Sequence, residues 1–575
     1  MPRLLACLLA MLLVPSSLSA LQVVSGVTGG TVIGQPARDV RPATGRSTIR
    51  GRVVAADSGQ PVRRAEVRIS AAELRVQRRI FTDADGRYAF GSLPAGRYSI
   101  IAIKTTFVGW SYGQTQFTSP GKPLVLADNQ TADNINISLP RGAVITGRVT
   151  DDFGDTVPNV RVQLMRQQFR QGARTLVPGG STVSTNDIGE YRVFGLTPGS
   201  YYLAATPQPA FFGGPGGGTI EGPESRTGYA PTFYPGTAEV ASAQKLTVGI
   251  GQTLSEINIM LLATRTATIS GMAVDAAGRP MGGFVQIVSR GGATGLGGPG
   301  GPIRPDGTFS ISDVTPGSYV LRANSPRVDS SGPANGPPEF SLAFVTVAGD
   351  DVSGVRLAPV IPVSITGRIS FEDQAAGQSL KPSAVRVVTL AATVGDAGIG
   401  IGSGGAPMPI KDDFTFELKT TPGQMGIRAL VPGWQVKAIR VNGTDVTDSG
   451  LDVGSQGASG VEIEMTNRLQ EISGGVTDAD RKAVDSYVVV MFAQDRARWV
   501  SVFNRYGATA RPGNDGRFKV TTLPPGDYYA IALDRSDAIE GQDPEFLDGL
   551  TRLASTVSLT PGETRTLDLK LFTVQ

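Results

Sequence analysis

A short strand pattern that ends in Gly-x-Val or a close variant recurs five times along the chain, and this repetition limits what the chain can fold into. The copies are TIRGRV (48–53), VITGRV (144–149), TISGMAV (268–274), SITGRI (364–369) and EISGGV (471–476). Their glycines, Gly51, Gly147, Gly271, Gly367 and Gly474, are spaced 96, 124, 96 and 107 residues apart. Because about 100 residues make one small domain, this spacing predicts a tandem array of domains rather than a single enzyme fold.

Two further patterns follow each copy in a fixed order. The first is an acidic-glycine turn, an alternating strand, a Pro-Gly turn and another strand, as in DADGRYAFGSLPAGRYSI (83–100), NDIGEYRVFGLTPGSYYL (186–203), RPDGTFSISDVTPGSYVL (304–321) and NDGRFKVTTLPPGDYYAI (514–531). The fourth copy, KDDFTFELKTTPGQMGI (411–427), has diverged. A closing strand ends each unit, in the segments 133–139, 255–261, 353–359, 459–465 and 565–571.

The closing strands alternate apolar and polar residues, as at Ile135, Ile137 and Leu139, and this alternation is typical of a strand with one face in a core. The acidic-glycine pairs suit tight hairpins, and the Pro-Gly pairs predict type II turns. We find no segment with the periodicity of a long amphipathic helix. The fold class predicted from these patterns is all-β, with sandwiches in tandem.

A tyrosine stands two residues after the turn glycine in four of the five units. We expect the rings of these tyrosines to be buried and their hydroxyl groups to reach a backbone partner, comparable to the tyrosine corner of immunoglobulin-like sandwiches. The four residues are Tyr98, Tyr201, Tyr319 and Tyr528.

The N-terminus resembles a secretory signal. Arg3 precedes an apolar run, Leu4 to Val14, and the small-residue stretch PSSLSA follows. No other apolar run reaches the roughly 18 residues that a membrane-spanning helix needs. We therefore expect an exported protein with no transmembrane segment in its mature chain, located in a periplasm, at a cell surface or outside the cell.

These observations give the predicted domain boundaries. A signal peptide (1–20) and a linker (21–47) precede five sandwiches, the fourth of them divergent, at 48–140, 144–262, 266–358, 364–466 and 470–575.

Composition excludes several kinds of chemistry. The chain has no histidine, so imidazole-based nucleophile activation and His-ligated zinc are excluded. Its one cysteine, Cys7, lies in the expected signal peptide, which leaves no thiol or disulfide in the mature chain. The net charge is only +3, and the arginines are dispersed along the sequence, so nucleic acid is not an implied partner. We predict no catalytic residue, no metal site and no cofactor, and hence no enzyme.

The combination of ITGRVTD, VPNVRVQL, the Asp-Gly and Pro-Gly turns and the closing INI strand resembles the carboxypeptidase regulatory-like domain. The resemblance covers residues 48–575, strongest in units one, two and five. It implies a transthyretin-like, seven-stranded sandwich, related to Cna B-type and carbohydrate-binding-like domains, in each of about five units. In the peptidases that give the family its name this domain accompanies a zinc catalytic domain, which this histidine-free chain lacks, so peptidase activity is not implied.

Two groups of aromatic residues are the candidate ligand-binding residues. Trp110, Tyr112 and Phe117 lie in FVGWSYGQTQF of unit one, and Tyr229, Phe233 and Tyr234 lie in a long insertion of unit two, 206–237. Exposed rings among Gly and Pro form platforms on which a sugar ring can stack. The alternative is that these rings cover an open sheet edge.

The sequence therefore favours a non-enzymatic protein that binds carbohydrate or mediates adhesion at the cell envelope, with a polysaccharide or another envelope protein as partner. The alternative function is a structural spacer or a protein-interaction scaffold. Glycan binding predicts that the rings at 110–117 and 229–234 are exposed, whereas a scaffold predicts that they are buried.

Overall fold

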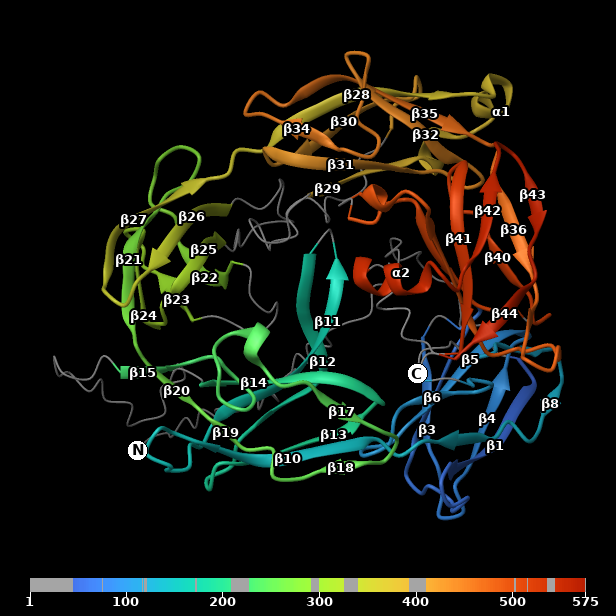
Figure 1. Cartoon of the computed structure of the whole chain (residues 1–575), viewed down its shortest axis with the longest axis horizontal. Coiled ribbons are helices and arrows are strands. Elements are labelled where there is room, and N and C mark those ends of the chain that lie inside the picture. The colour runs from blue at the N-terminus through green and yellow to red at the C-terminus, as the bar shows by residue number, and fades with distance from the viewer. Residues whose placement is uncertain are drawn as a thin grey trace, which may run out of the picture. The chain divides into compact units, whose positions relative to one another are not determined.

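The computed structural model of the chain is nearly all β (Figure 1). It describes residues 45–573 except 75, 116, 118–120, 171–172, 208–226, 291–298, 325–339, 392–409, 501–502, 514 and 535–542. The expected signal peptide (1–20) and all but the last three residues of the expected linker (21–47) lie outside the described residues.

The first sandwich has two sheets. One joins β4 (Arg87–Leu93), β1 (Ser47–Ala55), β8 (Thr131–Ala132) and β9 (Ile137–Leu139). The other joins β3 (Arg78–Phe81), β2 (Glu66–Ser70), β5 (Gly96–Ile103), β6 (Trp110–Ser111) and β7 (Leu124–Leu126).

The second sandwich repeats this arrangement and adds strands to it. One sheet joins β13 (Glu190–Leu196), β10 (Ala143–Thr150), β18 (Thr253–Leu254) and β19 (Ile259–Met260). The other joins β12 (Ala173–Ser184), β11 (Val160–Arg170), β14 (Gly199–Pro207), β16 (Thr232–Phe233) and β17 (Leu246–Val248). A separate pair consists of β15 (Thr227–Ala230) and β20 (Leu262–Arg265), and the 3-10 helix η1 spans Val240–Ser242.

In the third sandwich the two sheets are continuous. Their order is β23 (Gly300–Ile303), β22 (Gly283–Ser289), β25 (Gly317–Asn324), β26 (Phe340–Val347), β27 (Val352–Pro359), β21 (Ala267–Ala273) and β24 (Thr308–Val314). The join is made where β26 pairs with β27, with Leu342 opposite Ala358.

The fourth sandwich pairs a five-stranded sheet with a three-stranded one. The first is β30 (Thr415–Thr420), β28 (Val363–Phe371), β35 (Ala458–Thr466), β32 (Gln435–Val441) and β33 (Thr444–Asp445), and the second is β29 (Arg386–Ala391), β31 (Gly423–Leu430) and β34 (Leu451–Val453). Two short helices, α1 (Gln374–Gln378) and η2 (Pro382–Ala384), connect β28 to β29.

The fifth sandwich carries the longer of the two described α-helices. One sheet joins β40 (Phe518–Val520), β36 (Glu471–Gly474) and β43 (Thr564–Thr566). The other joins β37 (Val476–Thr477), β44 (Leu569–Phe572), β41 (Gly526–Leu533), β38 (Val488–Ala493) and β39 (Gly507–Ala510), and β42 (Ser555–Leu559) pairs with β41. Its helices are η3 (Arg496–Arg498) and α2 (Pro544–Leu550).

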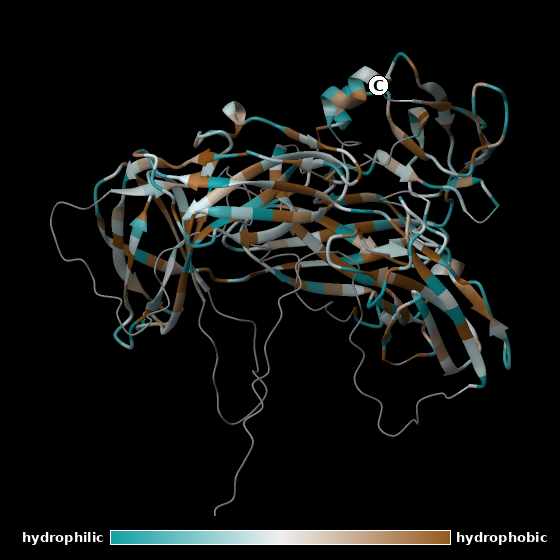
Figure 2. Ribbon diagram, turned by 90° about the horizontal axis from the view of Figure 1, so that it is seen from below, coloured by the Kyte–Doolittle hydropathy of each residue, from teal (hydrophilic) through white to brown (hydrophobic). Residues whose placement is uncertain are grey.

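One topology underlies all five units. The opening strand pairs antiparallel with the strand that follows the acidic-glycine turn and parallel with the closing strand, as β1 does with β4 and β9 and as β28 does with β30 and β35. Hydrophobic and hydrophilic residues alternate along many strands (Figure 2), and each unit encloses its own buried apolar cluster. The predicted all-β tandem of about five sandwiches is confirmed.

The recurrent glycine of the opening strand is required by a close approach of the backbone. A Cβ on Gly51 would overlap the carbonyl oxygen of Ile135 on the closing segment and would crowd the Tyr88 hydroxyl group. A Cβ on any of the other four glycines would likewise overlap a carbonyl oxygen of the closing segment and crowd an aromatic side chain. The carbonyl groups are those of Ile257, Val355, Val461 and Leu567, and the aromatic side chains are those of Tyr191, Phe309, Phe416 and Phe518. In the first two sandwiches the tyrosine hydroxyl also donates to that carbonyl oxygen.

The expected tyrosine corners are present. The hydroxyl of Tyr98 donates to the carbonyl oxygen of Pro94 at 2.7 Å, and the three others donate in the same way to Thr197, Thr315 and Pro524. All four rings are buried. The turns at the four Pro-Gly pairs differ from the predicted type II, since the φ angles of Gly199, Gly317, Gly423 and Gly526 are 142°, 158°, 130° and 153°, well beyond the value near +80° of that turn.

We predict that Gly51→Ala strongly destabilises the first sandwich, by roughly 3 kcal/mol or more, because the added methyl group forces the closing segment away from β1. Calorimetric unfolding of the mature chain measures this loss. Gly91→Ala is the matched control, since Gly91 lies in β4 of the same sandwich and a Cβ there meets nothing within 4 Å. Equal transition temperatures for the two variants would contradict the assigned role of Gly51.

We also predict a loss of stability of the fifth sandwich in alkali. Burial, with a smaller effect from Asp515, raises the pKa of Tyr487 from 10.0 to about 12, and its hydroxyl donates to the carbonyl oxygen of Gly516 at 2.8 Å. Between these pH values the unfolded state loses a proton that the folded state keeps, so the free energy of unfolding falls as pH rises. Denaturant midpoints measured against pH should fall less steeply for Tyr487→Phe than for the natural chain.

Candidate functional site

The first aromatic group forms a compact loop on the first sandwich. Trp110 lies in β6, which pairs with β5, and its indole nitrogen donates to the carbonyl oxygen of Gln114 at 3.1 Å. The rings of Trp110 and Phe117 meet edge to face, with centroids 5.2 Å apart. Trp110 and Tyr112 are half-buried and pack against the first core. These rings are therefore only partly available to a ligand.

The second group is divided between two environments in the second sandwich. Tyr229 and Tyr234 are half-buried against the main core, and the hydroxyl of Tyr229 faces Asp152 at 3.5 Å. Burial, together with the carboxylates of Asp151 and Asp152, raises the pKa of Tyr229. Phe233 is buried, because β16 adds to the edge of the sheet beside β14 and its ring enters a separate apolar cluster with Met165, Leu176 and Tyr202.

Five of the six aromatic residues are divided among three separate apolar clusters, and Phe117 packs on Trp110, so the structure does not unite them in one site. Phe233 is closed to solvent, and the other five are half-buried. That they bind a ligand stays a prediction.

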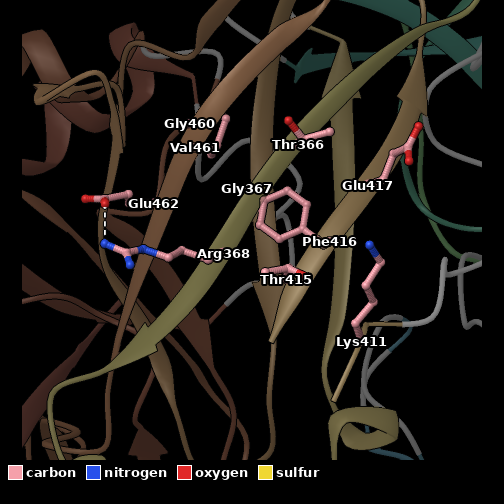
Figure 3. A pocket seen from close by; sticks show the side chains of 10 residues that line it. All are labelled: Thr366, Gly367, Arg368, Lys411, Thr415, Phe416, Glu417, Gly460, Val461 and Glu462. Carbon is pink, nitrogen blue, oxygen red and sulfur yellow. Dashed lines mark hydrogen bonds and ion pairs between the residues drawn. The ribbon is translucent and has the colours of Figure 1, made fainter. Parts of the chain in front are cut away.

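A shallow hollow of about 440 Å³ lies on the fourth sandwich (Figure 3). Gly367 and Gly460, which carry no side chains, line it together with the buried residues Phe416 and Val461. Three of its four charged lining groups are paired: Arg368 binds Glu462 at 2.7 Å, and Glu417 accepts from Lys419 at 2.8 Å. The hydrogen bond from Lys419, with one from Ser364, lowers the pKa of Glu417, which is therefore ill suited to act as a general acid.

The junction between the fourth and fifth sandwiches is a built interface that the sequence analysis missed. The Phe503 ring of the fifth sandwich, 2% exposed, fills a socket between Gly426 and Gly450 of the fourth, where a Cβ on either glycine would overlap the ring. The guanidinium group of Arg428 donates to the carbonyl oxygen of Phe503 at 2.7 Å. We call this the Phe503 socket.

A polar cluster borders the Phe503 socket. The guanidinium group of Arg505 donates to a carboxylate oxygen of Asp448 at 2.7 Å and to the carbonyl oxygen of Val436 at 2.9 Å. The Tyr506 hydroxyl donates to the other carboxylate oxygen of Asp448 at 2.7 Å. Burial, reinforced by this hydrogen bond, raises the pKa of Tyr506. A partly buried network with complementary charges favours one orientation of the two sandwiches.

The described residues contain no group of three or more His, Cys, Asp or Glu side chains placed to hold a metal ion. Among those same residues, no helix is both long and apolar enough to cross a membrane.

These observations define the class of protein as a tandem β-sandwich protein. The family comparison then matches part of it: residues 48–140, the first sandwich, match the model of the carboxypeptidase regulatory-like domain. A search of curated proteins found no match to the chain.

Solved structures of low sequence identity are similar to parts of the chain. The Bacillus anthracis TIE protein is 13% identical over 55% of this chain and 51% of its own, with a TM-score of 0.15. The Streptococcal ancillary pilin is 14% identical over 54% and 98%, with a TM-score of 0.19. Two B repeat units of the Staphylococcus aureus collagen-binding protein are 11% identical over 73% and 100%, with a TM-score of 0.12. The chain thus spans about half the length of the Bacillus anthracis structure that it matches.

We predict that Phe503→Ala uncouples the fourth and fifth sandwiches at a cost of about 3 kcal/mol, because it leaves the socket between Gly426 and Gly450 empty. Gly426→Val should have a similar effect by displacing the ring. Calorimetry of the mature chain should then show the two sandwiches unfolding in separate transitions. Gly454→Ala is the control, since a Cβ at Gly454 meets nothing within 4 Å. Unchanged unfolding in both socket variants would show that the sandwiches do not depend on this contact.

Proposed function

We propose that this chain is an exported, non-enzymatic adhesion-type protein of the cell envelope, in which firmly connected sandwiches hold binding surfaces in place. The observation that carries the proposal is the way in which successive sandwiches are joined. A display protein needs connections that resist independent motion of its domains, whereas flexible linkers leave domains free to reorient.

Two junctions support this proposal. At the connection between the first and second sandwiches, the amide of Gly142 donates to the carbonyl oxygen of Thr106 in the first sandwich at 3.0 Å, and the amide of Gly251 in the second donates to the carbonyl oxygen of Arg141 at 3.1 Å. Arg141 also lies over the Phe107 ring. Between the fourth and fifth sandwiches, the Phe503 socket buries an aromatic anchor, and anchors of this kind contribute most of the energy of a protein interface.

For the ligand, we propose a carbohydrate at one or both aromatic groups. Trp110, Tyr112, Phe117, Tyr229 and Tyr234 keep part of their surface exposed, and a partly exposed ring can stack on the apolar face of a sugar. The burial of Phe233 favours the alternative, in which the chain is a spacer or a scaffold for another envelope protein.

Binding of the purified mature chain to a panel of soluble and insoluble polysaccharides separates these two candidates. If the aromatic groups bind sugar, Trp110→Ala or Tyr234→Ala should weaken saturable binding to one glycan about tenfold, as measured by co-sedimentation and tryptophan fluorescence. Phe153→Ala should leave binding unchanged, because Phe153 is 85% exposed but lies outside both groups. Failure to bind any glycan would reject the carbohydrate proposal and favour the scaffold.

A further inference from the structure

Three arginines of the first sandwich lie on one face of one of its sheets. Directly opposite residues of antiparallel strands share a face, and the register places Arg79 of β3, Arg68 of β2 and Ile101 of β5 in one row. Phe81 and Glu66 lie in the next row, and Arg97 stands further along β5 on the same side. We call this surface, made of Glu66, Arg68, Arg79, Phe81, Arg97 and Ile101, the basic face.

The basic face is open to solvent. The side chain of Arg79 is 72% exposed, and the Phe81 residue is 59% exposed. Arg97 is also exposed. The residues between them, Val67, Ile69 and Ile100, point into the core, so the exposed side chains belong to one side of a well-packed sheet. An exposed phenylalanine among guanidinium groups on such a sheet marks a surface that can receive a partner.

The basic face has three guanidinium groups and one carboxylate. Arg68 donates two hydrogen bonds to the Glu66 carboxylate, at 2.9 Å and 3.2 Å, and the guanidinium group of Arg79 lies 3.6 Å from the same carboxylate. The hydrogen bond from Arg68 is the main cause of the lowered pKa of Glu66. Arg63, Arg64 and Lys104 lie at the end of the sheet where β2 begins, and Glu73 lies beside Gly96 near the other end. The face thus keeps a net positive charge.

This charge is a property of the first sandwich and not of the whole chain. Residues 48–140 contain 12 Lys and Arg against 7 Asp and Glu, whereas residues 364–466 contain 8 against 11 and residues 470–575 contain 12 against 15. A net charge of +3 therefore conceals a basic first sandwich and acidic later ones. Charge of one sign on one domain favours a partner of the opposite sign.

We propose that the basic face is the docking surface for an acidic polysaccharide, a glycan that carries carboxylates on successive sugar rings. The planar guanidinium group binds a carboxylate through two parallel hydrogen bonds, and the pair of Arg68 with Glu66 shows this geometry within the face itself. Phe81, beside Arg79, supplies a ring for the apolar side of a sugar. An open sheet face suits a linear polymer, on which several weak contacts act together. The inference rests on the proposed adhesion function and names the class of its ligand.

The test compares binding of the mature chain to polygalacturonate, to its fully methyl-esterified form, which lacks the charges, and to single-stranded DNA as a different polyanion. We expect binding to polygalacturonate only, weakening with added salt. Arg68→Gln with Arg79→Gln should reduce affinity about tenfold or more, since two charge-assisted contacts are lost. Phe81→Ala should reduce it several-fold. Glu66→Gln should increase it, because the carboxylate that competes for Arg68 is removed, and an increase cannot arise from misfolding.

The matched control is Arg192→Gln with Arg386→Gln, which removes two exposed strand arginines from the second and fourth sandwiches. An equal loss of affinity in this control would overturn the proposal in favour of general charge attraction. Equal binding of DNA, lost in the same variants, would replace it with a nucleic-acid surface. Binding to neutral glycans alone would overturn it and leave the proposed function intact, whereas failure to bind any glycan would reject both the acidic ligand and the carbohydrate proposal.

Discussion

Each sandwich depends on the close approach between the glycine of its opening strand and a backbone carbonyl of its closing strand. Gly51 and Ile135 make this contact in the first unit, under the ring of Tyr88. The contact ties the first strand of a unit to its last, and so fixes the parallel pairing that makes about 100 residues into one closed module. In the third, fourth and fifth units phenylalanine replaces tyrosine above the glycine, which keeps the packing without the hydrogen bond.

What distinguishes the units is built outside this shared module. In the fifth sandwich, α2 and Trp499 cover the outer face of the sheet, so that every residue of β38 is buried. In the second, β16 brings Phe233 into a cluster of its own. The first leaves the corresponding face open, and arginines occupy it. The same sheet face is thus covered in the fifth unit but open and charged in the first. This difference fits the proposal that some units are structural and others bind.

The sequence was sufficient for the strands, the tandem order and the tyrosine corners, because each depends on residues close together in the chain. The alternation of Ala65, Val67 and Ile69 with Glu66 and Arg68 is enough to place these two charged residues on the outward side of their strand. Alternation does not show which residues lie beside them, because Arg79 lies opposite Arg68, and Phe81 opposite Glu66, only through the register of β3 with β2. The Phe503 socket was missed for the same reason: Gly426 and Gly450 resemble ordinary turn or strand glycines until a ring from the next sandwich is placed between them. Contacts between units carry no local sequence signal.

The proposed function depends on firm connections between sandwiches that hold binding surfaces in fixed positions. The most direct test is the distribution of distances between spin labels at Thr444→Cys in the fourth sandwich and Lys570→Cys in the fifth, both exposed positions. The labelling is selective, because Cys7, in the expected signal peptide, is the one natural cysteine. The account predicts a single narrow distribution that broadens when Phe503→Ala is added. A broad distribution in the natural sequence background, unchanged by Phe503→Ala, would contradict it.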